Sequence, residues 1–201
     1  MPPISPMKDG ATGKTVKSAT LTPLRTLELN EVYQLITANK RLITLTQAIR
    51  EAALQGDDNN CRMLKQQTLL PYVTPCGVFT RRRSDCLKLP SGLVVVDVDH
   101  LDSPDEAGRL KQLLFKDPYL APVLVFISPT GRGVKAFVPC PIGKDSTEAV
   151  RWAMNYVHCM YDTENTQPGK GVDTSGKDLV RACFLCHDPK ALLRKVVNFE
   201  L

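Results

Sequence analysis

A run of six residues, Leu-Val-Val-Val-Asp-Val at positions 93–98, places the strongest constraint on how this chain can fold. Consecutive β-branched residues predict a strand buried on both faces, because side chains along a strand alternate between the two faces of its sheet. Polar residues are costly in such a strand. The two carboxylates at its end, Asp97 and Asp99, are therefore the first residues that need a functional explanation.

With one valine between them, Asp97 and Asp99 project from the same face of the predicted strand, roughly 6–7 Å apart. Buried carboxylates must be compensated by a metal, a cation or water, so the pair predicts a site for a divalent cation. The alternative is helix capping. Asp102 and Ser103 precede Pro104 and an amphipathic stretch, and for Asp102 a capping role is the better interpretation.

Elements of alternating type follow one another through the second half of the chain, as judged from hydrophobic periodicity. Together they predict an α+β fold with a ferredoxin-like or RRM-like βαββαβ core, an antiparallel sheet with helices on one face. The predicted strands are 93–98, 123–127, 134–138 and 180–185, and the predicted helices are 104–115 and 146–161.

The sequence before this core divides into two parts. Residues 1–25 lack an apolar period and predict a flexible segment. Residues 26–90 predict a small, mainly helical lobe, integrated with the core of residues 91–201 into one domain spanning 26–201. Within the lobe we expect helices at 28–36 and 45–54, a polar loop at 55–60, and an irregular or short-strand region over 63–79.

Positive charge is concentrated in the lobe. Residues 1–90 hold 13 Lys and Arg against 7 Asp and Glu, whereas residues 91–201 hold 13 against 14. The triplet Arg81, Arg82 and Arg83 would suit contacts to a phosphate backbone, although such a triplet is more often a solvated loop. No apolar run is long enough to cross a membrane and no signal peptide is visible, so we expect a cytoplasmic protein without a membrane partner.

Seven cysteines, an odd number, predict reduced thiols rather than a disulfide framework. Cys183, Cys186 and His187 match the pattern of c-type haem attachment, which requires export. The surrounding residues are apolar, and no second Cys-x-x-Cys accompanies them. A core strand is therefore expected here, with neither haem nor zinc.

Two further segments carry groups suited to phosphate and metal chemistry. The turn at 128–135 combines glycines, which let backbone amides approach a ligand, with hydroxyls and cations, although glycines also serve ordinary hairpin turns. Asp173 is the best candidate for a third carboxylate, and Arg181 is a cation available to a triphosphate. An ordinary turn aspartate, and an arginine paired with Asp178, are the alternatives. The residues expected to bind nucleotide are Ser128, Thr130, Gly131, Arg132, Gly133, Lys135 and Arg181.

Three motifs, at 94–99, 128–135 and 172–181, resemble in order and spacing those of archaeo-eukaryotic-type primase-polymerases. More closely, residues 25–195 resemble the VirE N-terminal-type domains found ahead of P-loop ATPase domains in replication and mobile-element proteins. The resemblance implies that Asp97, Asp99 and Asp173 are catalytic and ligate Mg²⁺ or Mn²⁺ in a two-metal site. It also implies that the turn at 128–135 grips the phosphates of an NTP or dNTP.

The expected function is metal-dependent, template-directed nucleotidyl transfer in the replication of a mobile element or phage. Partners would be single-stranded or primer-template nucleic acid and a separate helicase or ATPase, because the sequence contains no such part. One departure is Lys135, which stands where active primase-polymerases usually have histidine. Two alternatives therefore stay open: an inactive nucleic-acid-binding or replication-initiation module, and a metal-dependent nuclease.

Overall fold

The computed structural model describes residues 5–7, 22–67, 70–161, 170–173 and 179–194. The helices are α1 (Leu29–Ala38), α2 (Lys40–Leu54), α3 (Asp58–Gln67), α4 (Pro104–Lys116) and α5 (Ser146–Tyr161), with a 3-10 turn at Ser84–Cys86. The strands are β1 (Ser5–Met7), β2 (Tyr72–Thr74), β3 (Gly77–Phe79), β4 (Leu87–Pro90), β5 (Leu93–Asp99), β6 (Leu124–Ile127), β7 (Val134–Pro139), β8 (Gly171–Val172), β9 (Cys183–Phe184) and β10 (Leu192–Leu193).

The main sheet has the strand order β10-β6-β7-β5-β8, and each paired neighbour is antiparallel. Along the chain, β5, α4, β6, β7, α5 and β8 follow the βαββαβ order, with β5 and β7 adjacent at the centre. This is the arrangement of a ferredoxin-like fold. The α+β class predicted from the sequence is confirmed, and β10 extends the sheet beyond β6.

One predicted strand was wrong. The apolar run at 180–185 was expected to be the fourth strand of this sheet, but that place is taken by β8. Only Cys183 and Phe184 of the run form a strand, β9, which pairs with β2 in a separate sheet with the order β1-β2-β9. Strand β8, which consists of Gly171 and Val172, is too short to show a periodic pattern. The run at 180–185 is apolar because it packs inside the lobe.

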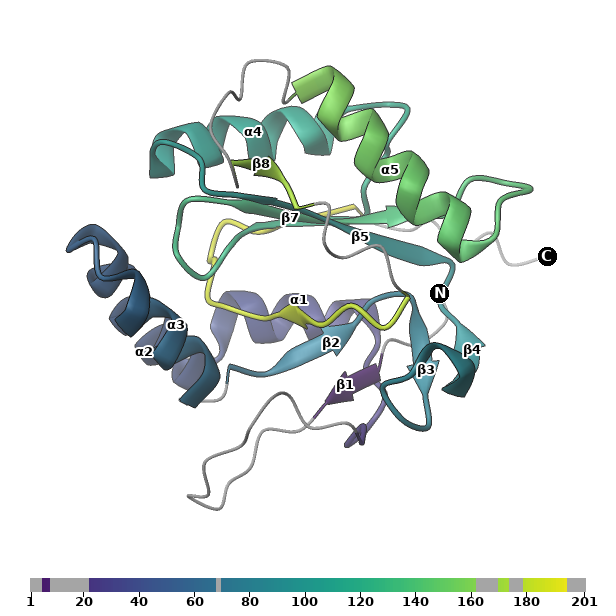
Figure 1. Cartoon of the computed structure of the whole chain (residues 1–201), viewed down its shortest axis with the longest axis horizontal. Coiled ribbons are helices and arrows are strands. Elements are labelled where there is room, and N and C mark those ends of the chain that lie inside the picture. The colour runs from purple at the N-terminus through teal and green to yellow at the C-terminus, as the bar shows by residue number, and fades with distance from the viewer. Residues whose placement is uncertain (1–4, 8–21, 68–69, 162–169, 174–178, 195–201) are drawn as a thin grey trace.

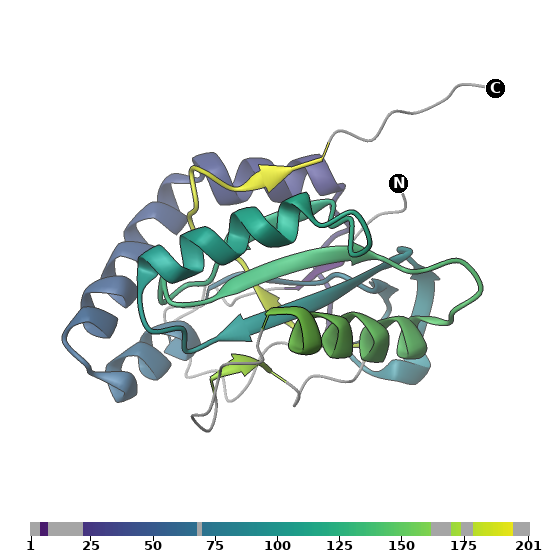
Figure 2. The same cartoon turned by 90° about the horizontal axis from the view of Figure 1, so that it is seen from above.

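The two faces of the sheet pack against different layers. Val94, Val96 and Val98 point into a core shared with α4 and α5. Leu93 and Val95 point into a second core shared with α1. Figure 1 shows α4 and α5 above the sheet and α1 below it, and Figure 2 shows α4 and α5 side by side over the sheet. Residues further along the odd-numbered face of β5 therefore point toward the N-terminal lobe.

The lobe begins with the two expected helices. The break between α1 and α2 is Asn39, whose side chain accepts a hydrogen bond of 3.1 Å from the amide of Leu42 and so caps α2. Helix α3 was not predicted from the sequence, because it begins inside the expected polar loop and because Cys61 is the only buried side chain among those of the helix that the structure describes. Ser5–Met7 pairs with β2, and the other residues before position 22 lie outside the described ranges.

A membrane-spanning segment would have to be a long and uniformly apolar helix. Among the residues that the structure describes, no helix meets that requirement.

Candidate functional site

Three acidic residues meet at one end of β5, on the face directed toward the lobe. Asp97 pairs with Lys135 of β7 in the strand register, and Asp99 pairs with Gly171 of β8. Asp173 follows β8 directly, and its backbone amide donates a hydrogen bond of 2.8 Å to the backbone carbonyl of Asp97. The sheet therefore brings together the three carboxylates expected from the sequence, across 76 positions of chain.

Two cations hold the carboxylates of Asp97 and Asp173. Lys135 Nζ forms an ion pair with Oδ2 of Asp97, and both side chains are less than a tenth exposed. Arg181 Nη2 lies 2.5 Å from Asp173 Oδ2 and 3.4 Å from Asp97 Oδ2, so it bridges the two residues. Burial lowers the pKa of Lys135, but attraction by Asp97 and Asp99 outweighs it and raises the pKa. Lys135 therefore stays charged.

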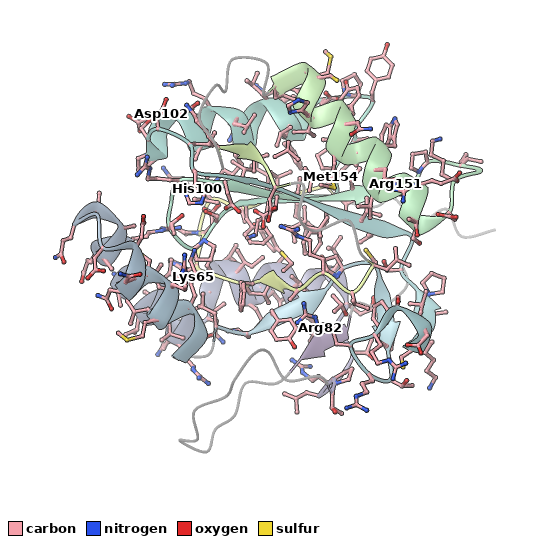
Figure 3. All side chains as sticks on the ribbon, viewed as in Figure 1. Lys65, Arg82, His100, Asp102, Arg151 and Met154 are labelled. Atoms are coloured by element: carbon pink, nitrogen blue, oxygen red, sulfur yellow. The ribbon has the colours of Figure 1, made fainter. Side chains whose placement is uncertain are left out.

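Asp99 is the least compensated of the three carboxylates. Burial raises its pKa, and repulsion by Asp97 raises it further, while the positive charges of Lys135 and Lys65 act in the opposite direction. Figure 3 shows Lys65 on α3 and His100 at the end of β5, on the same side of the molecule. Lys65 was not identified from the sequence, since it lies in the helix that periodicity missed.

A divalent cation would fit the Asp97 and Asp99 pair. Asp97 Oδ1 is buried and has no hydrogen-bond partner among the described residues, an uncommon state for a buried oxygen. A bound cation would satisfy this oxygen and offset the repulsion that raises the pKa of Asp99. In the described part of the chain, no group of three or more His, Cys, Asp or Glu side chains is arranged so that it could hold a metal ion. Arg181 stands between Asp97 and Asp173.

The turn between β6 and β7 closes over the carboxylates at Gly133. A Cβ atom on Gly133 would overlap the backbone carbonyl of Val98 and lie 2.9 Å from Ser128 Oγ and 3.1 Å from Asp99 Oδ1. The amide of Ser128 donates a hydrogen bond of 2.8 Å to the carbonyl of Gly133, which closes the turn. Glycine at 133 is therefore required for the turn to approach Asp99.

The remaining turn residues expected to bind nucleotide lie elsewhere. Thr130, Gly131 and Arg132 line a cavity with Arg50 of α2, and neither Asp97 nor Asp99 lines it. Gly131 has a φ of +79°, a left-handed conformation that favours glycine. The segment that the sequence presented as one phosphate-binding turn thus divides its residues between two locations.

The arginine triplet has contacts of its own. Arg82 Nε donates a hydrogen bond of 2.9 Å to the carbonyl of Val180, and its guanidinium lies 5.6 Å from the centre of the Tyr72 ring. Figure 3 shows Arg82 near the strands of the lobe. Arg83 forms an exposed ion pair of 2.5 Å with Asp85, and Arg81 is exposed. Arg82 therefore anchors the segment that carries Arg181.

The two cysteines of the Cys-x-x-Cys-His pattern are buried in the lobe core. Burial raises the pKa of each thiol to about 12, so both are protonated at neutral pH. Cys186 Sγ donates a hydrogen bond of 2.9 Å to the carbonyl of Ile127. Cys183 lies in β9, within the segment expected to be a core strand.

We expect Asp99→Asn to stabilise the protein at neutral pH. Because the pKa of Asp99 is raised in the folded state, the stability linked to its protonated form is present below the ordinary value of about 3.9. It is lost as the pH rises through the raised value. Asparagine carries no charge, so the variant does not lose this part of the free energy of unfolding at neutral pH. Each kcal/mol of added stability corresponds to about 2–4 °C in melting temperature for a chain of this size.

Thermal unfolding of the wild type and Asp99→Asn at pH 3 and pH 7 tests this prediction. The difference between the two proteins should be larger at pH 7. A variant that melts below the wild type at pH 7 would contradict it.

Comparison with known proteins gives one family. The model of the family described as BT4734-like, N-terminal domain, matches residues 63–193. No curated protein matches the chain, and no solved structure matches it. The matched segment runs from within α3 to the end of β10 and contains all three carboxylates. It covers more than half of the 201 residues, and the chain therefore belongs to the family of BT4734-like N-terminal domains.

Proposed function

We propose that this protein is a primase-polymerase-like domain that performs metal-dependent, template-directed nucleotidyl transfer. The observation that carries the proposal is the meeting of Asp97, Asp99 and Asp173 with two cations at one end of a ferredoxin-like sheet. The resemblance to VirE N-terminal-type domains spans residues 25–195 and includes the whole segment matched by the family model. Replication of a mobile element or phage is the context that this resemblance favours.

The acidic residues have the properties of ligands for Mg²⁺ or Mn²⁺. Asp97 would contribute Oδ1, which has no hydrogen-bond partner among the described residues, Asp99 the least compensated carboxylate of the three, and Asp173 its partly exposed carboxylate. When bound, such ions activate a 3′-hydroxyl and neutralise the charge of the departing pyrophosphate.

The cations would act on the nucleotide. Arg181 holds its carboxylates through one Nη atom, and a guanidinium can form two parallel hydrogen bonds to phosphate oxygens. Lys135 supplies a buried positive charge beside the same carboxylates, although as a point charge rather than an oriented imidazole donor. Both residues stabilise negative charge that develops on a triphosphate. Arg81, exposed on the basic lobe, would contact the template backbone.

A second candidate is a nucleic-acid-binding module that has lost turnover. The observation that favours it is the ion pairing of Asp97, which already has Lys135 and Arg181 on Oδ2. If these contacts persist when nucleotide is present, the carboxylate is not released to a metal. This candidate predicts salt-sensitive binding of single strands and no incorporation.

Incubation with labelled primer-template or unprimed single strand, Mn²⁺ or Mg²⁺, and NTPs or dNTPs separates the candidates. The matched control is Asp99→Asn, because it removes a proposed ligand and is expected to remain folded. A second measurement follows the melting temperature as Mn²⁺ is added. The melting temperature should rise for the wild type and stay level for the variant.

Extension by the wild type that falls to background in Asp99→Asn supports the polymerase. Retained binding of DNA without any product, in either metal and with either class of nucleotide, would leave the binding module. Shortening of the labelled strand would identify a nuclease that uses the same carboxylates.

A further inference from the structure

A cavity of about 330 Å³ lies beside the β6–β7 turn, and none of the three carboxylates is among its lining residues. Arg50 and Leu54 of α2, Gly108 of α4 and residues 130–132 of the β6–β7 turn are among its walls. Figure 1 shows α2 and α4 approaching the same end of the sheet. The volume is at the lower end of the range of ligand pockets, about 300–1,000 Å³, and is sufficient for a single nucleotide unit.

The cavity has an excess of positive charge. Four basic residues line it, Arg50, Lys111, Arg132 and Lys190, and among the described residues Asp188 is the one acidic residue in the lining. The charge of Asp188 is already compensated, because Lys111 Nζ lies 3.0 Å from it in a buried ion pair. Its oxygens also accept hydrogen bonds from the backbone amides of Ile127 and Lys190. The arginines and Lys190 therefore give the lining a net positive charge.

Arg50 is held in place with part of its guanidinium unused. Its Nη2 donates a hydrogen bond of 3.1 Å to the carbonyl of His187, which orients the group. Its Nε is buried and has no hydrogen-bond partner among the described residues. A buried donor without a partner is costly unless a ligand or water satisfies it. Arg50 lies directly beside the turn, because a Cβ on Gly131 would be in ordinary contact with it, 3.5 Å from Nε.

Arg132 reaches the cavity from the turn. Its Nε donates a hydrogen bond of 2.8 Å to the carbonyl of Leu101, so the guanidinium plane is fixed. Two oriented guanidinium groups and an ammonium group match the several oxygens of a phosphoryl group better than the two of a single carboxylate. Ala53, Leu54 and Ile127 add apolar wall beside these charges, suited to the flat face of a base.

We infer that this cavity is a second site, distinct from the carboxylate site, which binds the phosphoryl group of a nucleotide. The same chemistry could be presented by a free nucleoside polyphosphate or by the 5′-phosphate at the end of an oligonucleotide. Because none of the three carboxylates lines the cavity, the site does not depend on the proposed polymerase activity.

The test is calorimetric titration of the full chain in EDTA, so that divalent ions contribute nothing. The ligands are pyrophosphate, ATP, adenosine, and one oligodeoxynucleotide with either a 5′-phosphate or a 5′-hydroxyl. We expect pyrophosphate and ATP to bind at least about tenfold more tightly than adenosine, the factor for losing one charge-assisted hydrogen bond. Tighter binding of the 5′-phosphorylated strand than of ATP identifies a strand terminus as the source, and the reverse order identifies a free nucleotide.

Variants locate the binding. Arg50→Gln should weaken ATP binding about tenfold or more, and Lys190→Gln should weaken it in the same direction. Gly108→Leu should block the cavity without removing charge, because a Cβ at Gly108 meets nothing within 4 Å. The matched control is Arg151→Gln on α5, an element that does not line the cavity (Figure 3).

Absence of ATP and pyrophosphate binding in EDTA would overturn the proposal. So would equal affinities of Arg50→Gln and Arg151→Gln. If Arg50→Gln does not fold, the other two variants decide the question. The proposal is overturned if Lys190→Gln and Gly108→Leu both bind ATP with the affinity of the wild type.

Discussion

Asp97→Asn is expected to lower the free energy of unfolding by about 3–5 kcal/mol, because it leaves Lys135 charged and buried without its main partner. The opposite sign is expected for Asp99→Asn, although the two residues are one valine apart. Asp97 is held by Lys135 and Arg181, whereas Asp99 is repelled by Asp97. Urea unfolding at pH 7 measures both changes on one scale.

A double-mutant cycle assigns the loss to the pair. Lys135→Met alone should also lower the free energy of unfolding. The loss in the double variant Asp97→Asn/Lys135→Met should be smaller than the sum of the losses in the two single variants. Asp85→Asn is the matched control, because the Arg83–Asp85 ion pair is exposed, and its unfolding midpoint should equal that of the wild type. Additive losses in the cycle would show that Asp97 and Lys135 do not stabilise each other.

Gly133→Ala is expected to cost about 1–3 kcal/mol, the usual range for overpacking a filled site. The new methyl would overlap the backbone carbonyl of Val98, which cannot move without disturbing the pairing of β5 with β7 and β8. The turn would therefore be pushed away from Asp99, and the rise in melting temperature with Mn²⁺ that we predict for the wild type should shrink.

Gly108→Ala provides the matched control for that substitution. Gly108 lies inside α4, where a Cβ meets nothing within 4 Å, so alanine should raise the free energy of unfolding by about 0.5–1 kcal/mol. Urea unfolding compares the two variants. A Gly133→Ala protein as stable as Gly108→Ala would mean that the turn has room over Asp99.

The elements with strong periodicity could be predicted from the sequence. The apolar run of β5, the apolar face of α5 and Pro104 at the start of α4 are local signals, and the structure contains all three elements. The capping role expected for Asp102 was wrong, because the side chain of Ser103 accepts the hydrogen bond from the amide of Glu106, and Asp102 instead forms an ion pair of 2.6 Å with Lys170. Because β5 and β7 are central in this topology, the meeting of Asp97 with Lys135 followed from the element order.

Other features depend on packing between distant segments and could not be predicted. Helix α3 is polar along most of its length and is positioned by contact with α2. Arg50 looks like a surface residue of an amphipathic helix until the chain places His187 beside it, 137 positions later. The segment at 180–185 pairs with β2 instead of joining the main sheet for the same reason. No local sequence pattern shows that β2 offers a free edge to it.

The core below the sheet has a practical consequence for anyone who shortens this protein. The family match begins at residue 63, yet Leu29, Val32 and Ile36 of α1 pack in the same core as Val95 and Phe137 of the sheet. A fragment cut at the match boundary would expose that apolar face to water and invite aggregation. The smallest piece worth expressing therefore starts before α1, and an insoluble shorter fragment would carry no information about catalysis.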